Sequence, residues 1–165
     1  MVRQARLEDQ PAITRLIDGI YHLYGDRLRL DRADSDLVNI QDSYLDAGGI
    51  FGVVEDNGRI IATGAALPAP GNPRVCVLRR LYVDPAYWGT GLGNELMKWG
   101  LGWAREHDMV RIEFWSDVRF ARAHAFFRKW RFNQGPIRHM TDGWMPYDEY
   151  FFFRDVSAEP STGRD

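Results

Sequence analysis

A glycine-rich turn between a predicted strand and a predicted helix constrains the fold of this 165-residue chain more than any other feature. The strand covers residues 75–83, and the turn after it contains three glycines at a spacing of two: Gly89, Gly91 and Gly93. The helix runs from residue 89 to about 107, because apolar side chains recur on one face, namely Leu92, Leu96, Trp99 and Trp103. Such a turn gathers backbone amides at the positive end of the helix dipole. It favours an anion site, most naturally for a pyrophosphate, and the alternative is a tight turn needed only for packing.

Strands and helices alternate along the rest of the chain. Predicted strands cover residues 2–6, 50–54, 60–64, 75–83, 110–115, 132–139 and 147–156. Predicted helices cover residues 10–24, 35–47, 89–107 and 120–130. Asp9 is the expected N-cap of the first helix, Asn57-Gly58 suits a type I′ hairpin turn, and the prolines within 68–73 predict a loop. This order predicts a mixed sheet with helices on both faces, in one domain over residues 1–156, followed by a polar and mobile tail over 157–165.

Charge and composition exclude several classes of protein. The 21 lysines and arginines nearly balance 23 aspartates and glutamates, so neither nucleic acid nor an anionic membrane is an expected partner. No apolar run approaches the ~18 residues of a membrane span, and the first residues lack the apolar stretch of a signal peptide. With a single cysteine and four scattered histidines, the chain has no predicted disulfide or metal site. We therefore expect a cytoplasmic protein without a metal cofactor.

The glycine turn does not fit the two common nucleotide-binding patterns. The P-loop pattern requires Lys-Ser or Lys-Thr after the last glycine, whereas Gly93 is followed by Asn94 and Glu95. A Rossmann turn follows the first strand of its unit, whereas this turn follows about four strands. The segment LRRLYVDPAYWGTGLG at residues 78–93 instead resembles the signature of the GNAT superfamily of acyl-CoA-dependent N-acetyltransferases. The later segments IEF at 112–114 and RAHAFFRKWRF at 122–132 are similar to that family's closing strand and helix.

This resemblance covers nearly the whole chain and implies a fold and a ligand. The fold would be a mixed, mostly antiparallel sheet of six to seven strands, with a V-shaped opening between the central strands. Acetyl-CoA would bind in that opening, with its pantetheine arm paired to backbone groups of Leu81, Tyr82 and Val83. Its pyrophosphate would bind the amides of Gly89, Thr90, Gly91, Leu92, Gly93 and Asn94.

The chain departs from the family pattern at four positions. Trp88 replaces an arginine or glutamine that donates to the phosphates, which implies weaker cofactor binding. Phe120 replaces an asparagine near the pantetheine, and Arg131 replaces a glycine that ends a helix. Phe127 stands where many members have the tyrosine that protonates the departing thiolate. A thiol of pKa ~8.5 leaves as the thiolate near neutral pH, so Phe127 does not imply inactivity.

Acetylation of an amine requires a base, because an ammonium group of pKa ~10 has no lone pair with which to attack. Glu113, in the strand after the glycine-turn helix, occupies a position at which some family members carry a catalytic glutamate. The alternative is an ordinary ion-paired strand carboxylate. Asp117 is the second candidate base, and its alternative is a helix N-cap or a loop residue. Tyr150 is a candidate acid in place of the missing tyrosine.

The acceptor is the least constrained part of the hypothesis. Tyr21, His22 and Tyr24 end the first helix, which shapes the acceptor pocket in the family, so they are the predicted substrate contacts. The main hypothesis is an N-acetyltransferase acting on a small-molecule or peptide amine, as a monomer or homodimer. The alternative is a regulatory or sensor module that binds acyl-CoA without turnover, which the substitutions at Trp88, Phe120 and Phe127 favour.

Overall fold

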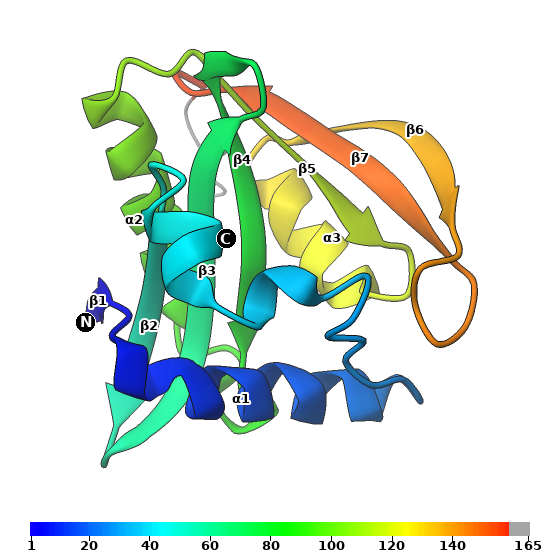
Figure 1. Ribbon diagram of the computed structural model, residues 1–165. Coiled ribbons are helices and arrows are strands. Elements are labelled where there is room, and N and C mark those ends of the chain that lie inside the picture. The colour runs from blue at the N-terminus through cyan, green and yellow to red at the C-terminus, as the bar shows by residue number, and fades with distance from the viewer. Residues whose placement is uncertain (159–165) are drawn as a thin grey trace.

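A seven-stranded sheet in the order β1-β2-β3-β4-β5-β7-β6 forms the centre of the computed structural model, which describes residues 1–158 (Figure 1). Its strands are β1 (Val2–Gln4), β2 (Ile50–Asp56), β3 (Arg59–Ala69), β4 (Asn72–Val83), β5 (Arg111–Asp117), β6 (Asn133–Met140) and β7 (Tyr147–Asp155). Every neighbouring pair is antiparallel except β4 and β5, which run parallel. The predicted mixed, mostly antiparallel sheet of six to seven strands is confirmed.

Helices cover both faces of this sheet. They are α1 (Gln10–Leu23), α2 (Leu92–Glu106) and α3 (Ala121–Lys129). One core joins α2 and α3 to the sheet and contains Ala66, whereas the core beneath α1 contains Ala65. Because successive strand residues point to opposite faces, α1 lies on one side and α2 and α3 lie on the other. Among the described residues, no helix has the length and apolarity needed to cross a membrane.

The hairpin prediction is confirmed, and the predicted proline loop is shortened to a turn at Pro70 and Gly71. Asn57 and Gly58 have φ values of 50° and 74°, which is the pair of positive angles that a type I′ turn requires. The segment 68–73 is mostly strand, because β3 continues to Ala69 and β4 begins at Asn72. The ladder shifts register between Pro68 and Ala69, and a proline is tolerated at such an irregular strand end because its missing N–H is not needed there.

The predicted helix over 35–47 is wrong, whereas Asp9 is the N-cap residue of α1 as predicted but makes no capping hydrogen bond with its side chain. The segment 35–47 forms a 3-10 turn at Ser35–Leu37 and a π-helix at Gln41–Leu45. Between them, the side chain of Gln10 donates to the Leu37 carbonyl and accepts from Ile40 N at 3.0 Å, so the backbone needs no continuous helix there. The Asp9 carboxylate instead accepts from Arg3 and from Arg6 N, each at 2.7 Å.

The predicted V-shaped opening lies between β4 and β5. The two strands pair only where Val75–Val77 meets Arg111–Glu113, and beyond these residues they diverge towards the side where α1 lies (Figure 1). A bulge in β4 accompanies the divergence, because Arg80 and Leu81 together oppose Gly64 and Arg80 has a φ of +56°. The tail predicted over 157–165 lies outside the described residues from residue 159 onwards.

Candidate active site

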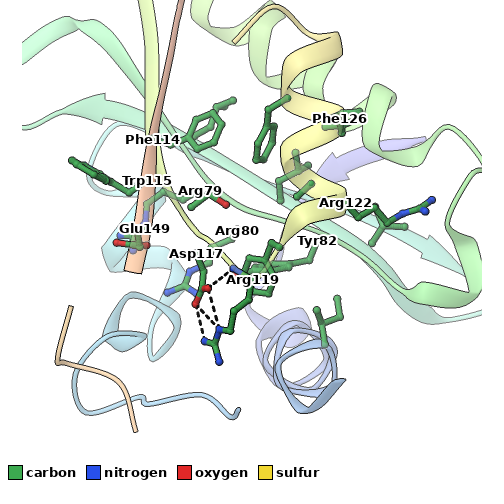
Figure 2. Close-up of a pocket in the computed structure, with 18 of the residues that line it drawn as sticks. Arg79, Arg80, Tyr82, Phe114, Trp115, Asp117, Arg119, Arg122, Phe126 and Glu149 are labelled. Carbon is green, nitrogen blue, oxygen red and sulfur yellow. Dashed lines mark hydrogen bonds and ion pairs between the residues drawn. The ribbon is translucent and has the colours of Figure 1, made fainter. Parts of the chain in front are cut away.

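A cavity of about 960 Å³ occupies the opening between β4 and β5. Its walls come from these two strands, from β7 and α3, from the glycine turn and from the residues after α1. Figure 2 shows Asp117, Arg119 and Glu149 close together on one side of this cleft, and Arg122 and Phe126 on α3 on the other side. The cleft is therefore a long channel with chemically different ends.

The glycine turn forms one end of the cleft. Gly89 and Gly91 have φ values of +78° and +91°, a conformation that L side chains rarely adopt, and α2 begins directly afterwards. Within residues 1–158, five backbone amides of the turn have no hydrogen-bond acceptor, namely those of Gly89, Gly91, Leu92, Gly93 and Asn94. All five residues line the cleft. Unpaired amides at a helix start are suited to bind an anion, which is the kind of site that the sequence predicts here.

Thr90 differs from its neighbours in the turn. Its amide donates to the Tyr87 carbonyl at 3.3 Å, and its hydroxyl donates to the same oxygen at 2.6 Å. Thr90 also does not belong to the residues that line the cleft. The predicted contribution of Thr90 to phosphate binding therefore gains no support from its position.

The exposed edge of β4 forms the middle of the cleft. Leu81, Tyr82 and Val83 line it beyond the last residue of β4 that pairs with β5, so this edge has no neighbouring strand. An extended chain that carries amides can pair with such an edge as an added strand does. The edge and the glycine turn together offer strand-type hydrogen bonds followed by an anion site.

A buried ion cluster holds the β4 bulge against the residues after α1. The Arg80 guanidinium, with 6% of the side chain exposed, donates to Asp34 at 3.0 Å and to both carboxylate oxygens of Asp36 at 2.9 and 2.5 Å. Tyr21 also donates to Asp34, at 3.1 Å, and Tyr44 donates to Asp36. Burial alone would raise the pKa of Asp36, but the hydrogen bonds and charge of Arg80 bring it below its ordinary value.

Glu113, the predicted base, lies in the cleft at the point where β4 and β5 separate. It is the last residue of β5 that pairs with β4, where it opposes Val77. Its carboxylate accepts a hydrogen bond from Arg111 Nε at 3.0 Å, and 30% of its side chain is exposed. Glu113 is therefore both an ion-paired strand residue and a cleft carboxylate, and the two interpretations of its sequence position are compatible.

Asp117, the second candidate base, is engaged by an arginine. Its carboxylate accepts from Arg119 at 2.7 Å, and Arg119 also reaches Asp26 at 2.8 Å (Figure 2). The helix-cap alternative for Asp117 is wrong, because Phe120 is the N-cap residue of α3. Arg119 thus joins the end of β5 to the segment after α1.

Glu149 is a cleft residue that sequence reasoning missed. It lies on β7 directly opposite Asp117, and its Oε1 accepts from Arg138 at 2.9 Å. Burial raises the pKa of Glu149 above its ordinary value, although Arg138 opposes this shift. The sequence around Glu149 contains no motif, so only the strand pairing identifies it.

Of the predicted acceptor contacts, two line the cleft and one does not. Tyr21 and Tyr24 face it, since they are three residues apart on one side of α1. His22 is rotated by about 100° around the helix, and it is exposed and bonded to the Asp18 carbonyl at 2.7 Å. Tyr150, the predicted acid, packs against His124 and Phe152 on the α3 face.

Residues 25–34 and 141–146, which together we call the loop rim, contact each other beside the cleft. The Trp144 indole donates to the Leu28 carbonyl at 2.9 Å. The Arg27 and Arg29 guanidinium carbons lie 3.9 and 4.3 Å from the centre of the Trp144 ring. These contacts join the tip of the β6–β7 hairpin to the segment after α1.

The sequence profile of the acetyltransferase (GNAT) family matches residues 17–132 of this chain. The chain belongs to the GNAT acetyltransferase family. Members of this family in general take their acetyl group from acetyl-CoA, and the amides and strand edge described above fit that donor. The predicted family membership and acetyltransferase activity are confirmed.

Two comparisons describe the relatives of this GNAT acetyltransferase. It is 32% identical to the uncharacterized N-acetyltransferase YjgM of Escherichia coli (strain K12), over 77% of this chain and 78% of that protein. Among solved structures, a GNAT-family acetyltransferase from Staphylococcus aureus Mu50 superposes with a TM-score of 0.80 at 19% identity, over 95% of this chain and 99% of that one. An acetyltransferase from Streptococcus agalactiae superposes with a TM-score of 0.80 at 18% identity, over 94% of this chain and 97% of that one. These structures share the fold.

Proposed function

We propose that this protein transfers the acetyl group of acetyl-CoA to the primary amine of a small molecule or peptide. The observation that carries this proposal is the continuity between the unpaired edge at Leu81–Val83 and the unpaired amides from Gly89 to Asn94. A ligand that fits both has an extended, amide-bearing arm attached to a pyrophosphate. Coenzyme A has this structure, with its reactive thioester at the end of the arm.

Glu113 is the proposed general base. The amine nitrogen attacks the thioester carbonyl carbon, and the nitrogen loses a proton as the new C–N bond forms. A carboxylate at the point where β4 and β5 separate receives that proton directly or through one water molecule. The C–S bond then breaks, and the electron pair leaves with the sulfur.

No side chain is required to protonate the departing sulfur. Phe127, which is 6% exposed and packed against Phe114, has no proton to donate. Tyr150 does not belong to the residues that line the cleft, and its ring packs against His124 and Phe152. A thiol with a pKa of ~8.5 departs as the thiolate and takes a proton from water.

The acceptor amine is proposed to enter through the loop rim, on the face of the sheet that carries α1. Tyr21, Tyr24, Asp142 and Glu149 line the cleft there. Since Trp144 joins the two sides of the rim, an acceptor presents its amine end-on instead of lying across the opening.

Calorimetric titration with acetyl-CoA, followed by measurement of CoA thiol release with a panel of amines, tests the function. The panel contains polyamines, aminoglycosides, amino acids and short peptides with free N-termini. Micromolar 1:1 binding and thiol release that depends on one amine class are the expected results. Binding without release on any amine would instead favour the acyl-CoA-binding module, and no binding would contradict both functions.

Replacing Gly91 with alanine is expected to weaken acetyl-CoA binding about tenfold. A left-handed backbone costs an alanine roughly 1–2 kcal/mol, so the turn shifts and its amides lose their alignment. The φ of Gly91 is +91°. Titration calorimetry measures the change, and the matched control is Gly102→Ala within α2, where an added Cβ meets nothing within 4 Å. Equal affinities for the two variants would contradict the role of the turn.

A further inference from the structure

Trp88 and Arg122 form a stacked pair at the glycine-turn end of the cleft. Trp88 directly precedes Gly89, and its indole N–H donates to the Val83 carbonyl at 2.9 Å. Arg122, in the first turn of α3, holds its guanidinium carbon 4.7 Å from the centre of the Trp88 ring. Both residues line the cleft, and Figure 2 shows Arg122 beside Phe126 on the side of the cleft formed by α3.

The charge of Arg122 is not neutralised by the protein. Within residues 1–158, no carboxylate and no hydrogen-bond acceptor is paired with the Arg122 guanidinium, and its recorded contact is the Trp88 ring. Other arginines of the cleft differ in this respect. Arg119 is paired with Asp117 and Asp26, and Arg138 is paired with Glu149. Arg122 is thus a cation available to a ligand.

Stacking on Trp88 holds the Arg122 guanidinium in an orientation suited to bind an anion. A guanidinium over an indole face gains about 0.5–1 kcal/mol at an exposed site, and it keeps its N–H groups free in the plane of the fork. Trp88 is itself held by its bond to Val83, so the pair has little freedom to lose when a ligand binds. The five unpaired amides of the turn begin at the next residue, Gly89.

We propose that Arg122, held on the face of Trp88, binds the pyrophosphate of acetyl-CoA. This inference rests on the proposed function. The indole N–H of Trp88 is occupied by Val83 and donates nothing to a phosphate. Trp88 is the positioning residue, and the side-chain donor that the family pattern has at position 88 is supplied here from α3.

The central experiment compares Arg122→Gln with Arg128→Gln. Arg128 lies on the same helix outside the cleft, where it donates to Gln134 at 3.1 Å, so it is a matched control for charge and helix propensity. A charge-assisted hydrogen bond lost from a phosphate is expected to raise the Kd for acetyl-CoA about tenfold or more in Arg122→Gln. The expected Kd of Arg128→Gln is that of the wild type.

Truncated donors identify the group that Arg122 binds. Acetyl-dephospho-CoA keeps the pyrophosphate, so the loss in Arg122→Gln is expected to persist with it. S-acetylpantetheine has no phosphate, so the kcat/KM values of the variant and the wild type are expected to agree with this donor. A loss that vanishes with acetyl-dephospho-CoA would overturn the pyrophosphate assignment, and an equal loss with S-acetylpantetheine would indicate a structural defect instead.

Rescue at position 88 completes the test. Trp88→Arg in the Arg122→Gln background returns a guanidinium beside the glycine turn, and we expect it to recover most of the lost affinity. An Arg122→Gln variant that binds acetyl-CoA as tightly as the wild type would overturn the inference while leaving the proposed function intact. Failure of the wild type itself to bind acetyl-CoA would instead overturn the proposed function.

Discussion

Replacing Arg80 with leucine is expected to lower the free energy of unfolding by about 3–5 kcal/mol, because the change leaves the buried Asp34 without its counter-charge and leaves Asp36 with only Arg79, at 3.7 Å. The side chains of Asp34 and Asp36 are only 5% and 12% exposed, and both accept from the Arg80 guanidinium. A leucine fills part of the volume and donates no hydrogen bond. Urea denaturation followed by tryptophan fluorescence measures the loss.

A control on the same strand separates this effect from a general loss of charge. Arg74 is an exposed β4 residue without an ion pair among residues 1–158, so Arg74→Leu is expected to change stability by less than about 0.5 kcal/mol. Arg80→Lys keeps the charge but not the planar guanidinium, so its loss of stability is expected to lie between those of Arg80→Leu and Arg74→Leu. A loss below about 1 kcal/mol in Arg80→Leu would contradict the structural role of the cluster.

The effect of Arg80→Leu is expected to depend on pH. In the wild type the pKa of Asp36 is lowered in the folded state, so its contribution to stability is present above the ordinary aspartate pKa and is lost as pH falls through the lowered one. In the variant Arg80 no longer opposes the effect of burial on the pKa of Asp36, so protonation of Asp36 in acid relieves part of the loss. The difference in stability between wild type and variant is therefore largest at neutral pH and narrows in acid.

Glu113→Gln is expected to reduce amine-dependent release of CoA about a hundredfold or more at neutral pH, which is the ordinary magnitude of general-base catalysis. Glutamine keeps the size of the side chain but accepts no proton. Affinity for acetyl-CoA is expected to stay that of the wild type, because Glu113 lies where β4 and β5 separate and is not part of the glycine turn proposed to bind the phosphates. The measurement is kcat/KM for the amine that the screen identifies.

A pH profile distinguishes a base from a structural residue. As pH rises towards the ~10 of an alkyl ammonium group, the neutral amine forms without help, so the deficit of Glu113→Gln is expected to shrink. A structural defect would give a deficit that does not change with pH. Glu106→Gln, at the exposed end of α2 outside the cleft, is the matched control and is expected to retain full activity. A Glu113→Gln variant with wild-type kcat/KM would contradict the role of Glu113 as the base and would make Glu149 the next candidate.

Local pattern was sufficient for most of the fold. The helix predicted over 10–24 is α1 at Gln10–Leu23, because its apolar spacing requires only residues within one element. The glycine turn and the Asn57-Gly58 hairpin also depend on short-range geometry. The helix prediction over residues 35–47 was wrong because this segment depends on contacts that are distant in sequence. Its backbone and carboxylates are bonded to Gln10 and Arg80, which are distant in sequence, so propensity alone does not determine its form.

The candidate site also contains residues that the sequence predicted and residues that only the tertiary structure places. The family resemblance predicted the residues of the turn, the β4 edge, Glu113, Tyr21 and Tyr24. All of these except Thr90 line the cleft. His22 and Tyr150 are each adjacent in sequence to residues that line the cleft, but neither of them lines it. A shift of one residue is about 100° on a helix and a change of face on a strand. The sequence therefore predicts the segment that contributes to the cleft, and the orientation of the helix or strand decides which of its residues line it.

The sequence by itself determined the family, the order of the elements and the presence of an amide-lined turn, because each depends on neighbours along the chain. Only the tertiary structure decided that Glu149 lies opposite Asp117, that Arg80 neutralises Asp34, and that Arg122 stacks on Trp88. Each of these pairs is more than 30 positions apart. Strand register and helix docking bring its members together, and the buried core, not the local sequence, determines that register.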